Sequence, residues 1–270
     1  MQQTIRLSVE DNTTFLLPPQ SSFFSSDCNE SRIFHQAIQQ KSKTNGSASQ
    51  FNVVVMDPPW PNKSVTRGHR QGQAQYDVSD SMWEMRQLLF DIDISPLLTS
   101  GGIVAVWITN KPAVRELVLS EEDGLFSSWG VELVEEWIWV KITTRGRPVL
   151  PVDGVWRQPY EVLLVGRKAK NSAPPPTSVL GKGGDVLDDG KKRVILAVPD
   201  LHSRKPCVKK LLQEIFNLPE DHQGLEVFAR NLISGWTSWG NQVLKFNDVN
   251  CWSSGKEADE DDPDEAGQKE

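Results

Sequence analysis

Short apolar runs alternate with amphipathic stretches along this chain, and the pattern predicts the order of its secondary structure. Continuously apolar runs are typical of buried strands, and alternating apolar and polar residues are typical of half-buried ones. Together they predict strands at 51–56, 101–108, 131–141, 161–167, 193–199 and 224–229. Apolar residues at helical spacing predict helices near 81–90, at 111–120 with Pro112 in the first turn, and at 205–216.

Strands that alternate with helices in this way predict an α/β fold, a mostly parallel sheet flanked by helices on both faces. The stretch 170–192 is rich in proline, glycine and aspartate, which is typical of a surface insertion rather than a linker between two domains. We therefore expect one domain over residues 21–252. An N-terminal extension at 1–20 precedes it, and a tail at 253–270 follows it.

Charge changes this picture only locally. The formal net charge is −7, but the tail holds eight acidic residues and two lysines, so residues 1–252 carry a net charge of only −1. This acidic composition predicts that the tail is disordered. Basic residues gather at 62–70, 143–148 and 202–210, and such loops attract phosphates over a Debye length of about 10 Å. Charge thus permits a nucleic-acid partner without requiring one.

Several functional classes are not expected. No apolar run approaches the roughly 18 residues of a membrane span, and the first residues show neither the basic nor the apolar region of a secretory signal. The three cysteines form no CxxC pair, and the four histidines have no ligand spacing. We therefore expect no metal site and no disulfide framework, which fits a reducing compartment.

The candidate chemistry lies where the first predicted strand ends, in FNVVVMDPPW (51–60). Pro58 and Pro59 stop the strand, and ligands of open α/β sheets bind beyond the carboxyl ends of the strands, which is where Asp57 stands. A carboxylate, a free carbonyl beside the proline pair and the face of Trp60 suit a planar heteroaromatic amine. Two N–H groups held by these oxygens leave the amine lone pair free to attack an electrophile without a metal. The simpler alternative is that Asp57 caps a turn.

This stretch resembles the DPPW signature of the MT-A family of S-adenosylmethionine-dependent adenine-N6 methyltransferases. Other segments that resemble family motifs are WVK (139–141), HSRKP (202–206), GLEVFARN (224–231) and WGNQV (239–243). The chain departs from the family's Glu-Leu-Phe-Gly-Arg stretch at Val227 and Ala229. The resemblance covers about residues 22–246. It implies a Rossmann-like methyltransferase fold in a permuted order, with the catalytic motif before the cofactor motif.

The resemblance also implies roles for individual residues. Asp57 and the Pro58 carbonyl, followed by Pro59, would hold the target amine, and Trp60 would pack against the adenine. Binding of S-adenosyl-L-methionine would fall to Asp27, Asp57, Lys205, Glu226, Arg230, Asn231, Asn241 and Gln242. Structural alternatives are a solvated lysine at 205, an amide cap at 241–242, and a Glu226 that only orients Arg230.

On the substrate side, the resemblance implies binding by Trp60, Asn62, Lys63, Tyr160 and Glu161. Glu161 is a candidate for reading the base edge, with a solvated strand end as the alternative. The target adenine must be unstacked, because its amine is unreachable inside a duplex. The basic loops 62–70 and 143–148 would hold the flanking phosphates. Trp137 and Trp139 alternate on one strand face, and we expect them in the core.

DPPWxNKSV, PYEVLLVGR and GWTSWGNxVLKF resemble, more narrowly, the branch represented in animals by methyltransferase-like protein four. That branch implies N6-methylation of 2′-O-methyladenosine in a small nuclear RNA, and hence a nuclear location, with the cytoplasm as an alternative. DNA is the alternative substrate. A catalytically silent RNA-binding partner subunit is the alternative of another class, but the presence of both Asp57 and Trp60 favours an enzyme. The branch resembles enzymes that work alone, so we expect a monomer, with a partner subunit as the alternative.

Overall fold

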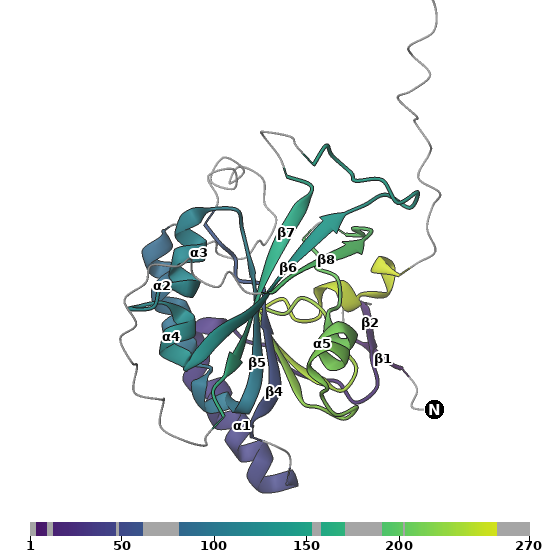
Figure 1. The fold of residues 1–270 in the computed structure, drawn as a ribbon. Helices are drawn as coiled ribbons and strands as arrows, with labels where there is room; N and C mark the ends of the chain where they lie inside the picture. Colours follow the sequence, from purple (N-terminus) through teal and green to yellow (C-terminus); the bar gives the residue numbers. More distant parts are fainter. Residues whose placement is uncertain are drawn as a thin grey trace, which may run out of the picture.

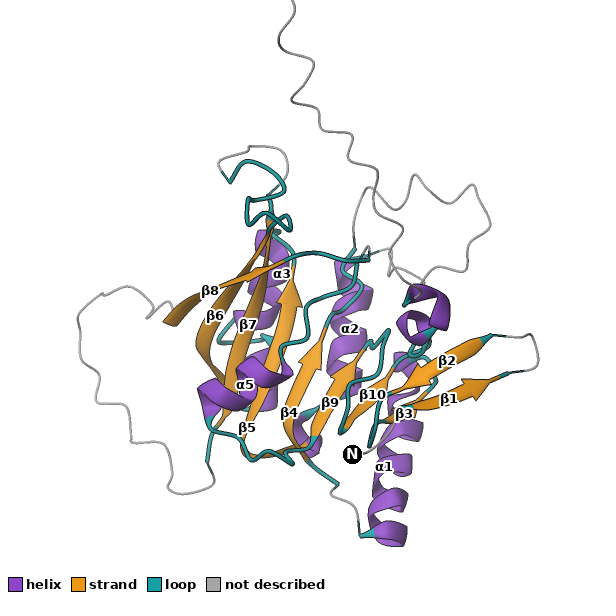
Figure 2. Ribbon diagram, turned by 90° about the vertical axis from the view of Figure 1, so that its right-hand side faces the viewer, coloured by secondary structure: helices purple, strands orange, loops and turns teal. Residues whose placement is uncertain are grey.

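The computed structural model of the chain describes residues 4–9, 13–46, 49–61, 81–152, 158–170, 191–201 and 203–252. An eight-stranded sheet forms its centre (Figures 1 and 2). In spatial order the strands are β3 (Ser22–Phe24), β10 (Trp236–Trp239), β9 (Gly224–Val227), β4 (Phe51–Met56), β5 (Leu98–Ile108), β7 (Tyr160–Lys168), β6 (Val131–Lys141) and β8 (Lys191–Ala197).

Most neighbouring strands of this sheet are parallel, as the sequence predicts. From β3 through β10, β9 and β4 to β5, each strand runs parallel to the next. Strand β7 is antiparallel to β5 and β6, and β8 is parallel to β6. Seven of the strands therefore end at one edge, where β7 begins. We call this edge the carboxyl edge.

Helices cover both faces of the sheet. Those on one face are α1 (Ser31–Asn45), α2 (Met82–Ile92), α3 (Pro112–Leu119) and α4 (Leu125–Trp129), and α5 (Lys209–Phe216) lies on the other (Figures 1 and 2). The Ser81 hydroxyl caps α2 by accepting from the Glu84 backbone N–H at 3.2 Å. Pro112 occupies the first turn of α3, as predicted, because its missing N–H has no partner there in any helix.

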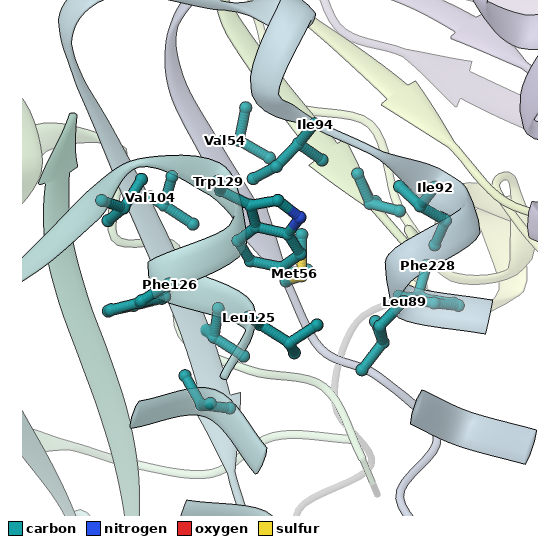
Figure 3. Packing of buried hydrophobic residues seen from close by; sticks show 14 of the residues in the cluster. Val54, Met56, Leu89, Ile92, Ile94, Val104, Leu125, Phe126, Trp129 and Phe228 are labelled. Atoms are coloured by element: carbon teal, nitrogen blue, oxygen red, sulfur yellow. The ribbon is translucent and has the colours of Figure 1, made fainter. Parts of the chain in front are cut away.

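Alternation along β4 decides which face the site uses. Val54 and Met56 point into the core beneath α1–α4 (Figure 3), whereas Val53 and Val55 belong to the core beneath α5. Successive side chains of a strand point to opposite faces, so Asp57 shares the α5 face with Val55. Asp57 therefore lies on the opposite face of the sheet from the larger core beneath α1–α4.

A hairpin of β1 (Ile5–Ser8) and β2 (Thr14–Leu17) lies beside the sheet within the predicted N-terminal extension. Buried Asn247 fastens it to the domain, because its side-chain amide donates to the Leu16 carbonyl at 2.7 Å. The side-chain oxygen Oδ1 of Asn247 accepts from the Leu232 backbone N–H at 2.8 Å. The hairpin is thus tied to the loop that follows β9.

All predicted strands and helices are present; strands 51–56 and 131–141 have the predicted ends, and the ends of the others are shifted. Strand β8 begins at Lys191, so the last residues of the predicted insertion 170–192 belong to the sheet. Residues 171–190 and the tail 253–270 lie outside the described residues. Trp137 and Trp139 are buried in the core, as expected. No helix among the described residues is long and apolar enough to cross a membrane.

Candidate active site

Asp57 is the first residue after β4 and stands between two cations. Its Oδ2 accepts from the Lys205 ammonium at 3.0 Å and from the Arg230 guanidinium at 3.2 Å. The exposed fraction of the side chain is only 17% for Lys205, 19% for Asp57 and 21% for Arg230. Ion pairs so far out of water are stronger than surface pairs, so the two cations hold the Asp57 side chain in one orientation.

Uncommon backbone turns bring both cations to Asp57. Phe228 has φ 59° and precedes Arg230 by two residues, and Ser203 has φ 67° and precedes Lys205 by two. Left-handed backbone costs a residue with a Cβ about 1–2 kcal/mol, and such strain clusters at functional sites. Phe228 is packed in the core beneath α1–α4 (Figure 3), and this packing holds the turn.

Lys205 also joins Asp57 to Glu161, at the start of β7. Its ammonium lies 3.0 Å from a Glu161 carboxylate oxygen, and Lys141 lies 2.6 Å from the other. Burial would raise the pKa of Glu161, but Lys205 and Lys141 outweigh it and lower that pKa. Burial also opposes the charge on Lys205, yet the Asp57 and Glu161 carboxylates raise its pKa. The result is a charged chain Asp57–Lys205–Glu161–Lys141 along the carboxyl edge.

The DPPW segment differs from the sequence prediction in one contact. The Trp60 backbone N–H donates to the Pro58 carbonyl at 2.8 Å, so this carbonyl is not free, although its second lone pair can accept from a ligand. The Trp60 ring is only 7% exposed, and its indole N–H donates to the Trp107 carbonyl at 2.7 Å. These bonds fix the loop against β5. Stacking of a base on Trp60 stays a prediction.

A pocket opens beside Asp57 on the α5 face of the sheet. Its polar lining includes Asp57, Arg204, Lys205, Glu226, Arg230 and Asn231, and its apolar walls include Trp107, Trp139, Phe228, Trp236 and Phe246. The structure therefore brings together most of the predicted cofactor residues, which come from segments far apart in the sequence. They meet because β4 and β9 are neighbours in the sheet.

Three predicted cofactor residues do not line this pocket. Asp27 follows β3, and Asn241 and Gln242 follow β10, so all three stand farther along the same carboxyl edge. Asp27 is exposed and its carboxylate caps a short 3₁₀ helix by accepting from the Asn29 N–H at 2.9 Å. Gln242 accepts from Lys245 at 3.2 Å. Their contacts with a cofactor stay predictions.

Glu226 is the most unusual group of the pocket. Its Oε2 is buried and has no hydrogen-bond partner among the described residues. Burial, and secondarily the nearby Asp57 carboxylate, raise its pKa from 4.5 to about 8, although Arg230 and Arg204 act in the opposite direction. It does not form the ion pair with Arg230 that its spacing suggested, since the guanidinium donates to Asp57.

Replacing Glu226 by glutamine is expected to stabilise the protein without ligand. The folded protein holds the Glu226 proton more tightly than the unfolded chain, so the free energy of unfolding falls as pH rises from about 4.5 to about 8. In urea unfolding, the excess stability of Glu226→Gln should grow across this window by at most about 1.4 kcal/mol per pH unit, then level off. Exposed Glu220→Gln is the matched control. An excess independent of pH would contradict the assignment.

The remaining substrate residues are placed unevenly. Tyr160 is half-buried at the start of β7, beside Glu161, and Asn62 and Lys63 lie outside the described residues, as does the basic loop 62–70. The loop 143–148 is an exposed tight turn closed by the Thr143 N–H, which donates to the Arg147 carbonyl at 2.7 Å. It extends from the carboxyl end of β6, next to Lys141.

Sequence reasoning missed other pocket residues. Arg204 pairs with Asp200 at 3.1 Å and lies 4.6 Å from the centre of the Trp252 ring, and Phe246 also lines the pocket. Only the neighbourhood of Lys205 in HSRKP could have drawn attention to Arg204. Among the described residues, no three His, Cys, Asp or Glu side chains gather where they could hold a metal ion.

The pocket fits a cofactor that carries positive charge beside an apolar and aromatic body. The half-buried carboxyl group of Asp57 and the buried Oε2 of Glu226 suit a cation, and Oε2 has no hydrogen-bond partner among the described residues. The Asn231 amide and the aromatic walls suit a nucleoside with hydroxyl groups. S-adenosylmethionine has all of these features, so the residues present fit it.

Comparison with protein families matches residues 51–242 to the MT-A70 family. Among curated relatives, N6-methyladenosine RNA methyltransferase MTA1 of Pyricularia oryzae is 44% identical over 207 residues, 76% of this chain and 50% of the relative. N(6)-adenine-specific methyltransferase METTL4 of Homo sapiens is 38% identical, over 87% of this chain and 44% of the relative. The DNA N6-methyl methyltransferase of Caenorhabditis elegans is 31% identical, over 85% of this chain and 53% of the relative. The chain thus spans about half the length of these relatives.

Proposed function

The chain belongs to the MT-A70 family, and from that premise we propose that it methylates the N6 amine of adenine in RNA, with S-adenosylmethionine as donor. The observation that carries the proposal is the end of β4. There the Asp57 carboxylate and the Pro58 carbonyl stand beside a pocket that suits a cationic nucleoside cofactor. An acid at this place that served only as a turn cap would not need two half-buried cations to hold it.

Each residue of the site has a task in this reaction. Asp57 and the second lone pair of the Pro58 carbonyl accept the two N–H groups of the amine, which directs the nitrogen lone pair into the pocket. Lys205 and Arg230 fix the orientation of the Asp57 carboxylate through its Oδ2. S-adenosylmethionine, when bound, supplies a methyl group on positively charged sulfur. Exclusion of water by Trp107, Trp139 and Phe246 strengthens these interactions.

A nucleic-acid strand is the proposed substrate because basic groups and a candidate base-edge acceptor share the carboxyl edge with Asp57, and RNA is preferred because a relative that is 44% identical is named an RNA methyltransferase. Glu161 is joined to Asp57 through Lys205. Its carboxylate can accept a hydrogen bond from the edge of an unstacked base once its ion pair with Lys205 or Lys141 breaks. The turn 143–148 presents Arg145 and Arg147 on the same edge, at a place suited to flanking phosphates. The relatives named as RNA methyltransferase and as DNA methyltransferase leave DNA as the alternative.

The narrower branch favours 2′-O-methyladenosine of a small nuclear RNA as the target, and a nuclear site of action. We test the substrate with labelled cofactor and four matched oligonucleotides: RNA and DNA of one sequence, the RNA with 2′-O-methyl on the target adenosine, and the RNA with guanosine in its place. Transfer to the 2′-O-methyl RNA should be fastest, and transfer to the guanosine control absent. Faster transfer to the DNA would identify DNA rather than RNA as the substrate. Transfer to none of the four oligonucleotides would contradict the enzyme function and favour the silent partner subunit.

Removing both arginines of the 143–148 turn is expected to weaken RNA binding without changing cofactor binding. If Arg145 and Arg147 each neutralise one phosphate, Arg145→Ala/Arg147→Ala should reduce the slope of log K against log salt by about 1.4, or about 0.7 for each contact. Fluorescence anisotropy with labelled single-stranded RNA at several salt concentrations measures the slope. The control is Arg32→Ala/Lys43→Ala on the exposed face of α1. An unchanged slope would remove this turn from the RNA-binding surface.

A further inference from the structure

Glu226 lies beside the end of β4, inside the pocket. In the parallel pairing of β4 with β9 it stands opposite Val55, so both side chains point to the α5 face, and Asp57 follows Val55 by two residues on that face. Its Oε2 is out of contact with water and accepts no hydrogen bond among the described residues. A buried carboxyl group without a partner costs stability, and such a group lining a pocket is typical of one that waits for a ligand.

The charged groups around Glu226 leave it unneutralised. Asp57 at the end of β4 repels a charge on it, whereas Arg230 after β9 and Arg204 before α5 attract one. Arg230 is engaged by Asp57, and Arg204 by Asp200. Cys207, on the segment that leads into α5, also faces it, and the charge of Glu226 is among the causes that raise the pKa of that thiol. With its pKa raised to about 8, Glu226 is a neutral acid at pH 7.

We propose that Glu226 is the counter-charge of the cofactor's sulfonium: it is a carboxylic acid before the cofactor binds and loses its proton as the sulfonium enters. The inference rests on the proposed function and deepens it. A unit positive charge a few ångströms from a carboxyl group out of water stabilises the carboxylate by several kcal/mol, which is enough to reverse its protonation. Asp57 cannot serve both needs, because its Oδ2 already accepts from two cations and its other oxygen must receive the amine.

The same group balances the charge after transfer. When the amine nitrogen bonds to the methyl carbon, the sulfur–carbon bond breaks and its electron pair stays on sulfur, which becomes a neutral thioether. The methylated nitrogen gives up one proton to water. Glu226, no longer facing a positive charge, takes up one proton, so the protein returns to its starting charge.

Calorimetry separates this proposal from the proposed function. Binding of S-adenosylmethionine and of S-adenosylhomocysteine, which has the neutral thioether, is measured at pH 7 in buffers of different ionisation enthalpy. We expect release of about one proton with S-adenosylmethionine and markedly less with S-adenosylhomocysteine. Equal release with both ligands, or none with either, would overturn the role of Glu226. Failure of both to bind would instead overturn the proposed function.

Variants of Glu226 and the pH dependence of ligand binding provide an independent test of the proposal. Glu226→Gln should bind both ligands without the difference in proton release, whereas exposed Glu220→Gln should behave as the unchanged protein. In the unchanged protein, the ratio of the Kd of S-adenosylhomocysteine to that of S-adenosylmethionine should rise with pH by up to about tenfold per unit, and level off above about 8. The ratio cancels titration of the amino group that both ligands carry. A flat ratio would contradict the proposal even if Glu226→Gln failed to fold.

Discussion

Asp57→Ala is expected to lower kcat/KM for adenine methylation by about 10³-fold or more, which corresponds to about 4 kcal/mol of lost transition-state stabilisation. In the proposed mechanism the carboxylate is the stronger of the two acceptors for the amine, and the weaker one, the Pro58 carbonyl, already accepts from the Trp60 N–H. Without Asp57 the nitrogen lone pair is no longer directed into the pocket. Initial rates with saturating cofactor and an adenine-containing RNA measure the change.

The matched control is Asp123→Ala, which removes a carboxylate that accepts from Arg86 at 3.1 Å outside the site. Its rate should stay within about twofold of the unchanged protein, because an exposed ion pair contributes little to stability and none to the site. Retention of methyl transfer by Asp57→Ala, with the same fold by circular dichroism, would remove Asp57 from the amine-binding role.

Lys205→Met is expected to lower kcat/KM by about 10²- to 10³-fold, a loss typical of removing one preorganised charge from an active site. The substitution leaves two half-buried carboxylates, Asp57 and Glu161, without the cation that lies between them. Because Lys205 helps to hold the pKa of Glu161 below its usual value, that pKa should rise. The acid limb of the pH profile should therefore move to higher pH.

Lys210→Met, on the exposed surface of α5, controls for loss of a lysine in the same segment. Methionine keeps the length and the apolar stem of the side chain, so a folding defect is separated from loss of charge by thermal unfolding. If Lys205→Met lowers the rate but leaves the acid limb of the pH profile at the same pH, Lys205 does not act through the carboxylates.

The sequence predicts those parts of the fold that long patterns determine. Strands 51–56 and 131–141 begin and end as observed, since each is a long apolar or alternating run. The short strands β3 and β10 are not predicted because three or four residues are too few to show a period, whereas the equally short β9 is recognised only as part of the longer run GLEVFA (224–229). Helix α1 escapes because its buried face rests on few residues, chiefly Phe34 and Ile38, in an otherwise polar segment. The MT-A resemblance is confirmed by the family match.

The site is predictable only in part, for a physical reason. The proline pair marks the strand end, which places Asp57 at the edge where ligands bind. Lys205 and Arg230 reach Asp57 across 148 and 173 residues of sequence, and their convergence depends on the strand order β9–β4–β5 and on left-handed turns that no local pattern announces. Glu226 likewise enters the pocket because β9 pairs with β4 in a register that places it opposite Val55, and this register cannot be inferred from the local sequence.

The central claim is that the end of β4 holds the adenine amine while its nitrogen is methylated. The most direct test is single-turnover transfer from S-adenosylmethionine with a deuterated methyl group to adenine-containing RNA, followed by digestion and mass spectrometry of the nucleosides. We expect the label on N6 of adenine with the unchanged protein and none with Asp57→Ala. Label on another atom or base, or equal labelling by the two proteins, would contradict the account.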